Sequence, residues 1–223
     1  MRDIILASAS PRRRDILTEL GFGFDVVVHD IDETRLDHLP PSERVLALAH
    51  AKAQSVRGEA LLRGAVVIAA DTLVCDPFPL PLPESAGDFV DLSGSRTLGK
   101  PTNREDARRM LRLLSGRSHS VHTGLVILDA AASREEAALS TSLVRFASLS
   151  ESEIEAYLAS GEWEGVAGAY RIQGLAALFI EEIRGSWSGI VGLPIHELYA
   201  ILCRLSIETP ALMPEKFPPF GAR

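Results

Sequence analysis

The chain has 223 residues, of which 46% are hydrophobic and 24% charged, a composition typical of a folded soluble protein with a sizeable core. Its net charge of -7 argues against a general nucleic-acid or membrane-surface binder, because such proteins are usually basic. No apolar run approaches the roughly 20 residues of a membrane span, and none resembles a signal peptide. Cys75 and Cys203 form no CxxC or Cys/His metal-ligand spacing, so we expect both thiols to be reduced and buried. We expect a cytoplasmic protein.

The first predicted unit is a strand, a tight turn and a helix. An apolar run at 4–7 leads into serines, Ser10 is a plausible N-cap, and Pro11 suits the first helical turn. The free N–H groups of such a helix, together with Arg12 and Arg13, would form a phosphate site. An ordinary strand–turn–helix with solvated arginines fits the segment equally well.

A second predicted strand, 24–28, runs into an acidic cluster of Asp30, Asp32 and Glu33. Carboxylates just past a strand end could hold a divalent metal. The same residues could equally form a solvated loop, and this segment alone favours the loop.

A helix that begins near Ser42 carries Lys52 on its apolar face, four residues after Leu48 and three after Ala49. A lysine in that position must either extend its stem to water or meet an anion inside a cleft. Both interpretations stay open from the sequence.

The run 65–70 predicts a buried strand that ends on Asp71 and Thr72. Open α/β sheets place ligand chemistry at strand ends, although an aspartate there can also cap a turn. The proline-rich stretch that follows, 76–98, has no clear periodicity and predicts a long surface loop.

Thr102 and Glu105 form a capping box that predicts a helix to about residue 114. Alternating residues then predict strands over 119–128 and 141–147. His119 and His122 fall on opposite faces of the first of these strands, which argues against a joint metal site and favours structural histidines.

A second capping box, Ser150 with Glu153, predicts a helix that ends before Gly161. The glycine-spaced stretch 161–174 indicates backbone close to a ligand or a set of tight turns. Two further strands are predicted over 176–183 and 186–191. The last predicted elements are a helix from Pro194 to about Leu205 and a proline-rich tail, 206–223.

Taken together, these segments resemble the Maf-like nucleoside triphosphate pyrophosphatases. The resemblance covers residues 4 to about 203, and several weak motifs in the family's order make it strong. The motifs are Ser8-Ala-Ser-Pro-Arg-Arg13, Asp32-Glu33, Lys52-Ala53, Ala70-Asp71-Thr72, Leu98-Gly-Lys-Pro101, Leu114-Ser-Gly-Arg-Ser-His119 with Thr123-Gly124, Ala167-Gly-Ala-Tyr-Arg-Ile-Gln173-Gly174 and Val191-Gly-Leu-Pro194.

The resemblance implies an α/β fold with an elongated mixed central sheet flanked by helices and a cleft between two lobes, like that of inosine triphosphate pyrophosphatases. It implies one domain, 1–205, with a loop insertion at about 76–97. The implied reaction cleaves a nucleoside triphosphate between its α and β phosphates, giving a nucleoside monophosphate and pyrophosphate. A homodimer is also implied.

The resemblance also implies roles for particular residues. Asp71 would accept a proton from the attacking water, and Glu33 and Asp71 would bind Mg²⁺ or Mn²⁺. Lys52 would stabilise the negative charge of the leaving group. The implied substrate-binding residues are Ser8, Arg12, Arg13, Thr72, Lys100 and Gln173.

Within the family, Thr72 and Gln173 resemble the branch that acts on dTTP and UTP, since an amide offers both a donor and an acceptor to the imide edge of the base. The family often has Asp-Lys where Gly165 and Val166 stand here, so a lysine contribution from that position is absent. A nucleotide-binding regulator of cell division without useful turnover is the alternative, since the family name is associated with septum formation.

Overall fold

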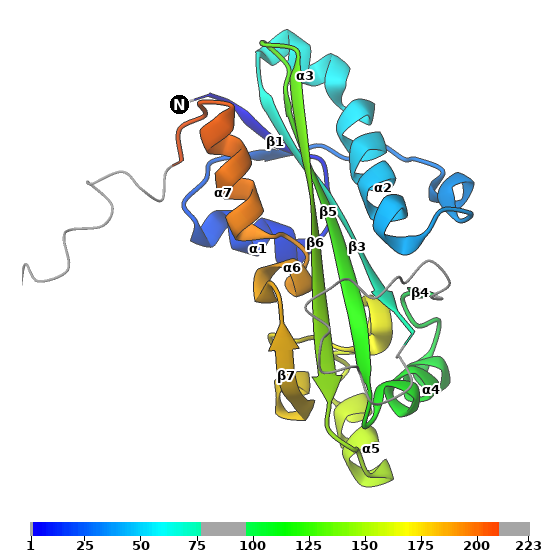
Figure 1. Ribbon diagram of the computed structural model, residues 1–223. Coiled ribbons are helices and arrows are strands. Elements are labelled where there is room, and N and C mark those ends of the chain that lie inside the picture. The colour runs from blue at the N-terminus through cyan, green and yellow to red at the C-terminus, as the bar shows by residue number, and fades with distance from the viewer. Residues whose placement is uncertain (1, 77–96, 210–223) are drawn as a thin grey trace, which may run out of the picture.

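The computed structural model describes residues 2–76 and 97–209, whose centre is a mixed seven-stranded sheet in the order β2-β1-β3-β5-β6-β7, with β4 paired to β3 (Figure 1). The strands are β1 (Ile4–Leu6), β2 (Asp25–Val26), β3 (Val66–Cys75), β4 (Thr97–Leu98), β5 (Ser118–Asp129), β6 (Arg134–Phe146) and β7 (Ile180–Arg184). The α-helices are α1 (Pro11–Glu19), α2 (Pro41–Ser55), α3 (Arg57–Arg63), α4 (Arg104–Leu114), α5 (Glu151–Ala159), α6 (Trp187–Val191) and α7 (Ile195–Arg204). Short 3-10 helices are η1 (Glu33–Leu36), η2 (Ala167–Ala169) and η3 (Leu175–Phe179).

The sheet is elongated because its strands differ in length. β1 has 3 residues and runs parallel to both β2 and β3, whereas β3, β5 and β6 have 10, 12 and 13 residues, and β5 runs antiparallel to both of its neighbours, β3 and β6. The long strands therefore extend well past β1, with α1, α2, α3 and α7 around one half and α4, α5 and β7 around the other (Figure 1). This confirms the expected elongated mixed sheet flanked by helices.

Alternation along β3 divides the core between the two faces of the sheet. Ile68 and Ala70 belong to a cluster that includes the apolar residues of α1 and α7. Val67 and Ala69 belong to a second cluster with the apolar residues of α2 and α3. We call these sides the α1 face and the α2 face; by the same alternation Asp71 lies on the α2 face and Thr72 on the α1 face.

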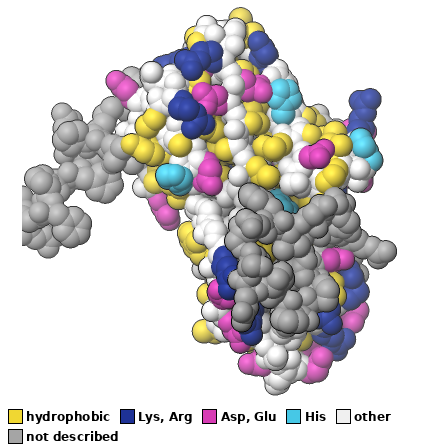
Figure 2. All heavy atoms as spheres, in the orientation of Figure 1, with side chains coloured by type: hydrophobic (Ala, Val, Ile, Leu, Met, Phe, Trp, Pro, Cys, Tyr) yellow, Lys and Arg dark blue, Asp and Glu magenta, His cyan; other side chains and the backbone are white. Residues whose placement is uncertain are grey.

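The end of the molecule formed by α4 and α5 carries interspersed charges on its surface (Figure 2). Arg104 and Arg108 bond to Glu155, and Arg112 bonds to Glu151. Exposed ion pairs of this kind contribute little stability, about 0–1 kcal/mol each. The two helices are therefore held mainly by their buried apolar residues.

The two predicted capping boxes have different outcomes. Ser150 and Glu153 form the expected reciprocal pair at the start of α5. The prediction at Thr102 and Glu105 is wrong, because the Asn103 side chain caps α4 and accepts the N–H of Asp106. Thr102 instead donates its own N–H to the Asp106 carboxylate, 3.1 Å away, so the cap stands one residue later than predicted and the reciprocal box does not form.

Of the predicted strands, 176–183 is wrong in part and 186–191 is wrong throughout. In the span 176–183 only the segment from Ile180 onward pairs with β6, and the chain before it forms η3. The predicted strand 186–191 is the helix α6, because the Ser186 side chain accepts the N–H of Gly189 and nucleates a helical turn. The last helix begins after Pro194 and ends at Arg204, close to the prediction.

Cys75 is buried, as expected, and burial raises the pKa of its thiol to about 11. Cys203 is exposed near the end of α7, so that half of the prediction is wrong. None of the helices within 2–76 and 97–209 is long and apolar enough to cross a membrane. The predicted loop insertion and tail fall largely outside the described residues.

Candidate active site

A pocket opens where β1 ends beside a strand that continues. The last ladder pair of β1 is Leu6 with Ile68, and the Ala7 N–H still donates to the Ile68 carbonyl oxygen at 2.9 Å. Beyond that point no described strand pairs with this side of β3 until β4 joins it at Val74, and a cavity of about 680 Å³ lies between the start of α1 and α2. Asp71 was expected just after a strand end, but it lies inside β3, because pairing with β5 extends the strand to Cys75.

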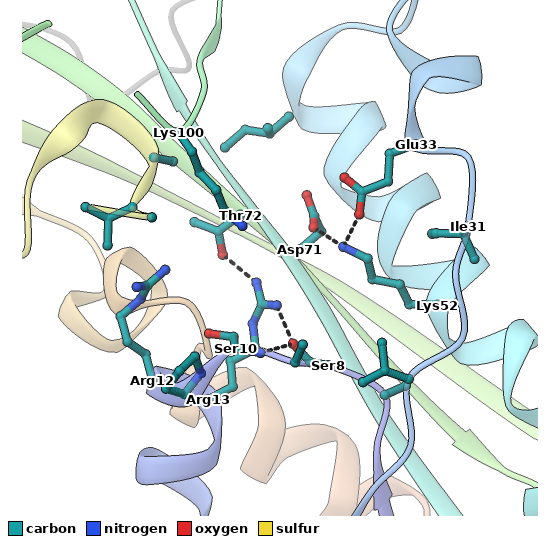
Figure 3. A pocket seen from close by; sticks show the side chains of 18 of the residues that line it. Ser8, Ser10, Arg12, Arg13, Ile31, Glu33, Lys52, Asp71, Thr72 and Lys100 are labelled. Carbon is teal, nitrogen blue, oxygen red and sulfur yellow. Dashed lines mark hydrogen bonds and ion pairs between the residues drawn. The ribbon is translucent and has the colours of Figure 1, made fainter. Parts of the chain in front are cut away.

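On the α1 face, Arg13 is held by three hydrogen bonds. Its Nη1 donates to Ser8 Oγ at 2.8 Å and its Nη2 to Thr72 Oγ1 at 3.1 Å (Figure 3). Its Nε donates to the Gly192 carbonyl oxygen at 2.7 Å. Burial lowers the pKa of the Arg13 guanidinium, and the Asp71 carboxylate acts in the opposite direction. An arginine stays charged at neutral pH, and two of its five N–H groups are left to meet a ligand.

Two further cations line the same pocket. Arg12 is half-buried, and desolvation, followed by the nearby charge of Arg171, lowers the pKa of its guanidinium. The exposed Lys100 reaches into the pocket (Figure 3). Among the described residues neither Arg12 nor Lys100 has an ion-pair partner. The pocket therefore carries positive charge that the described acids do not neutralise.

On the α2 face, a lysine joins two carboxylates. Lys52 Nζ lies 2.5 Å from Asp71 Oδ1 and 2.8 Å from Glu33 Oε1 (Figure 3). The side chains of Lys52 and Asp71 are 19% and 12% exposed, whereas that of Glu33 is 48% exposed. The lysine on the apolar face of α2 thus meets anions inside a cleft, which decides the question that its sequence position left open.

A glycine lets α2 approach the sheet beside these groups. Gly124 is paired with Asp71 in the ladder, and a Cβ atom built on it would lie 2.4 Å from the carbonyl oxygen of Val45 in α2. Any larger residue would push the helix away from the strand. Gly124 therefore sets the distance from which Lys52 reaches Asp71.

The remaining predicted residues divide into those inside and those outside the pocket. Ser8 and Ser10 line it, but Ser10 makes no side-chain cap and donates its N–H to Ser8 Oγ at 3.3 Å. Asp32 caps η1 by accepting the Thr34 N–H. Gln173 is exposed and is not one of the described residues that line the pocket.

The sequence patterns gave no role to Thr123, Gly189 and Gly192. Thr123 Oγ1 lies 2.9 Å from Thr72 Oγ1 and donates to the Gly189 carbonyl oxygen at 2.8 Å. Gly192 has φ +127°, a conformation that favours glycine, and its carbonyl holds Arg13. Thr123 and Gly192 each belong to one of the family motifs, whereas Gly189 belongs to none of them.

The described residues contain no group of three or more His, Cys, Asp or Glu that could enclose a metal ion. The two carboxylates that share the Lys52 ammonium can nevertheless fit Mg²⁺ or Mn²⁺, because such ions are often held by one or two carboxylates together with waters and substrate phosphates. The chemistry of Glu33 and Asp71 therefore fits a metal that arrives with a polyanion.

The site places a proton acceptor beside a group of positively charged side chains. Asp71 receives its described hydrogen bond on Oδ1, which leaves Oδ2 for another partner. Arg12, Arg13 and Lys100 provide charge for an extended anion such as a polyphosphate. No covalent nucleophile is required for water to attack a substrate held in this way.

The family model and the curated relatives agree on one family. Residues 3–205 match the family model described as Maf-like protein. A dTTP/UTP pyrophosphatase of Pelotomaculum thermopropionicum is 44% identical over 202 residues, covering 91% of this chain and 96% of the relative. One of Desulforamulus reducens is 41% identical over 209 residues, covering 93% and 99%. Among solved structures, a HAM1 protein from Coxiella burnetii aligns over 92% of this chain and 100% of its own, with 18% identity and a TM-score of 0.46.

Proposed function

The chain belongs to the Maf-like protein family, and from this premise we propose that it is a nucleoside triphosphate pyrophosphatase that hydrolyses dTTP and UTP to the nucleoside monophosphate and pyrophosphate. The observation that carries the proposal is the pairing of Asp71 with Lys52 on one face of β3, opposite the buried Arg13 on the other. The names of the relatives support the choice of substrates.

In the proposed reaction a water molecule attacks the α phosphorus. Its oxygen forms the new bond to phosphorus while the bond from the α phosphorus to the oxygen bridging to the β phosphate breaks, and pyrophosphate leaves. Asp71 accepts the proton of the water on Oδ2, because Lys52 occupies Oδ1. Lys52 also keeps the carboxylate in place on the α2 face.

The cations act on the triphosphate. Arg13 is held rigidly by Ser8, Thr72 and Gly192, so it presents its two remaining N–H groups without further ordering. Arg12 and Lys100 add charge where negative charge builds up on the leaving pyrophosphate. Glu33 and Asp71 would hold Mg²⁺ or Mn²⁺, which when bound polarises a phosphate oxygen and neutralises charge.

The proposal also states which residues contact the base. Thr72 lines the pocket, and we assign it a contact to the base. Gln173 lies outside the pocket lining, so its predicted contact to the base has to be tested separately. Replacing it, Gln173→Ala, should change the ratio of UTP to CTP turnover if the contact forms when nucleotide binds.

The experiment that tests the proposal is a panel of nucleoside triphosphates incubated with the purified protein and Mg²⁺ or Mn²⁺, with both products identified. Monophosphate plus pyrophosphate, formed fastest from dTTP and UTP, is the expected result. Nucleotide binding without turnover by any member of the panel would favour the alternative, a nucleotide-binding regulator of cell division. Orthophosphate in place of pyrophosphate would contradict the bond assignment.

We further propose that residues 1–205 form one domain, that the protein is a homodimer and that it acts in the cytoplasm. The distribution of the family match over 3–205 supports the domain boundary. Light scattering of the purified chain tests the dimer, and cell fractionation tests the location. A monomer at micromolar concentration would overturn the dimer without touching the proposed activity.

A further inference from the structure

A chain of hydrogen bonds crosses the α1 face from the pocket to the C-terminal part of the protein. Arg13 Nη2 donates to Thr72 Oγ1 at 3.1 Å, Thr72 Oγ1 lies 2.9 Å from Thr123 Oγ1, and Thr123 Oγ1 donates to the Gly189 carbonyl oxygen at 2.8 Å. Thr123 is fully buried, whereas Thr72 is partly exposed and lines the pocket.

The direction of this chain follows from the number of protons available. A threonine hydroxyl has one proton and two lone pairs. Thr123 donates its proton to the carbonyl oxygen of Gly189. This carbonyl lies near the end of the 5-residue helix α6, and the N–H of Leu193, four residues later, donates to the Ser188 carbonyl oxygen and not to that of Gly189. Thr123 can therefore only accept from Thr72, and Thr72 must be the donor of the pair.

The same count decides what Thr72 can offer a ligand. Its proton is directed at Thr123 and one of its lone pairs is occupied by Arg13, so only one lone pair remains. Thr72 can accept a hydrogen bond from a ligand but cannot donate one. Phosphate oxygens at neutral pH are acceptors, so this oxygen suits a donor elsewhere on the nucleotide.

The donors common to dTTP and UTP are the 3′-hydroxyl and the N3–H of the base. The 3′-hydroxyl is also present in CTP, whereas the N3 atom of cytosine carries a lone pair in place of a proton. An oxygen that can only accept bonds the N3–H of thymine or uracil, and it faces cytosine N3 lone pair to lone pair. Sites built on such a contact reject the mismatched base because a polar group is left unpaired.

We propose that Thr123, through its bond to Gly189, holds the hydroxyl of Thr72 in an accept-only orientation and thereby selects pyrimidines that carry an N3–H. Thr123 is a positioning residue, since it acts on the substrate through Thr72. This inference rests on the proposed function and on the assignment of Thr72 to the base. It adds a physical cause for preferring dTTP and UTP over CTP.

The test compares kcat/KM for UTP and CTP in the full-length protein and three variants. In Thr123→Val the Thr72 proton is released and can turn toward cytosine N3, so the preference for UTP should fall about fivefold, as expected for one hydrogen bond. Thr123→Ser keeps the hydroxyl and should retain the wild-type ratio. Thr141→Val is the matched control: it removes a hydroxyl bonded to His122 on the α2 face and should leave the ratio unchanged.

An unchanged UTP to CTP ratio in Thr123→Val would overturn the inference, and so would an equal loss in Thr141→Val. A uniform loss for both nucleotides would indicate that the relay positions Arg13 only, which also overturns it. Thr72→Val provides a second measurement if Thr123→Val does not fold, since it removes the acceptor and must also reduce the ratio. Absence of any UTP turnover in the wild type would instead contradict the proposed function.

Discussion

The two faces of β3 hold their functional groups in opposite ways. On the α1 face, Arg13 is buried and bonded to neutral oxygens of Ser8, Thr72 and Gly192. On the α2 face, Lys52 balances the charges of Asp71 and Glu33, and the latter is half exposed. One face is a network of fixed hydrogen bonds, and the other is a cluster of ions open to exchange.

This difference assigns phosphate binding to the α1 face and the chemical step to the α2 face. A guanidinium with neutral partners keeps its full positive charge for a phosphate, and its ordering is complete before the ligand arrives. A lysine shared between two carboxylates can exchange partners when a metal and a polyanion enter, because Glu33, one of its two partners, is half exposed. Changes to the hydrogen-bonded groups of the α1 face should therefore act mainly on stability and ligand binding, and changes to the ionic groups of the α2 face mainly on turnover.

The largest expected effect is on the α2 face. Asp71→Asn removes the proposed proton acceptor and should lower kcat by about 10²- to 10⁴-fold. The melting temperature should stay close to that of the wild type, because the amide can still accept from Lys52. Steady-state release of pyrophosphate and a thermal melt check both parts. Full activity in this variant would contradict the role of Asp71.

The matching change on the α1 face is Arg13→Lys. A lysine cannot reproduce the fork that reaches Ser8, Thr72 and Gly192, so the free energy of unfolding should fall by about 2–3 kcal/mol. Arg12→Lys, at a half-buried neighbour, is the control and should change stability by less than about 0.5 kcal/mol. Urea titrations measure both. Equal losses would remove the distinction between the two arginines.

Gly124→Ala tests the contact that brings α2 to the sheet. The added Cβ would meet the Val45 backbone at 2.4 Å, so the helix must shift, which should cost about 1–3 kcal/mol of stability. Lys52 shifts with the helix, and kcat should drop about tenfold. Gly58→Ala in α3, where a Cβ meets nothing within 4 Å, is the control and should be neutral or slightly stabilising. A Gly124→Ala variant with wild-type kcat would show that catalysis does not depend on the contact between α2 and the sheet.

The smallest expected effect is on the stability of the fold at acidic pH. His119 on the α1 face is fully buried, and burial lowers its pKa from 6.5 to about 3. Between these pH values the unfolded chain takes up a proton that the folded protein does not, so this histidine makes the folded state less stable as the pH falls below 6.5. His119→Gln should reduce the loss of stability between pH 7 and pH 5, measured by urea titration. The exposed His50→Gln is the control, and an equal reduction in both variants would contradict the assignment to His119.

Local patterns predicted much of the fold correctly. The buried run before Asp71, the amphipathic face of α2 and the Ser150 capping box each depend on neighbours within a few residues, and each is confirmed. The helix α6 was misread as a strand, because the span 186–191 is too short for helical periodicity to emerge and its cap at Ser186 was not recognised.

The candidate site was only partly predictable. Glu33, Lys52 and Asp71 were selected from the sequence, and the structure brings them together. Arg13 was selected too, but not its bond to Gly192, a residue 179 positions away. Gln173 was selected from a motif and lies outside the described pocket lining, since η3 and the turn before it carry it to the surface.

The period of apolar residues along the chain identified most of the strands and helices and the charged residues that lie beside the core. Three features became visible only in the folded protein: β3 continues past Asp71, Lys52 lies between two carboxylates, and the Thr72 hydroxyl has no proton left for a ligand. The difference arises from the distance along the chain over which each kind of interaction acts. Burial and helix capping act between near neighbours, whereas strand pairing and hydrogen-bond direction depend on partners that only the assembled sheet brings into contact.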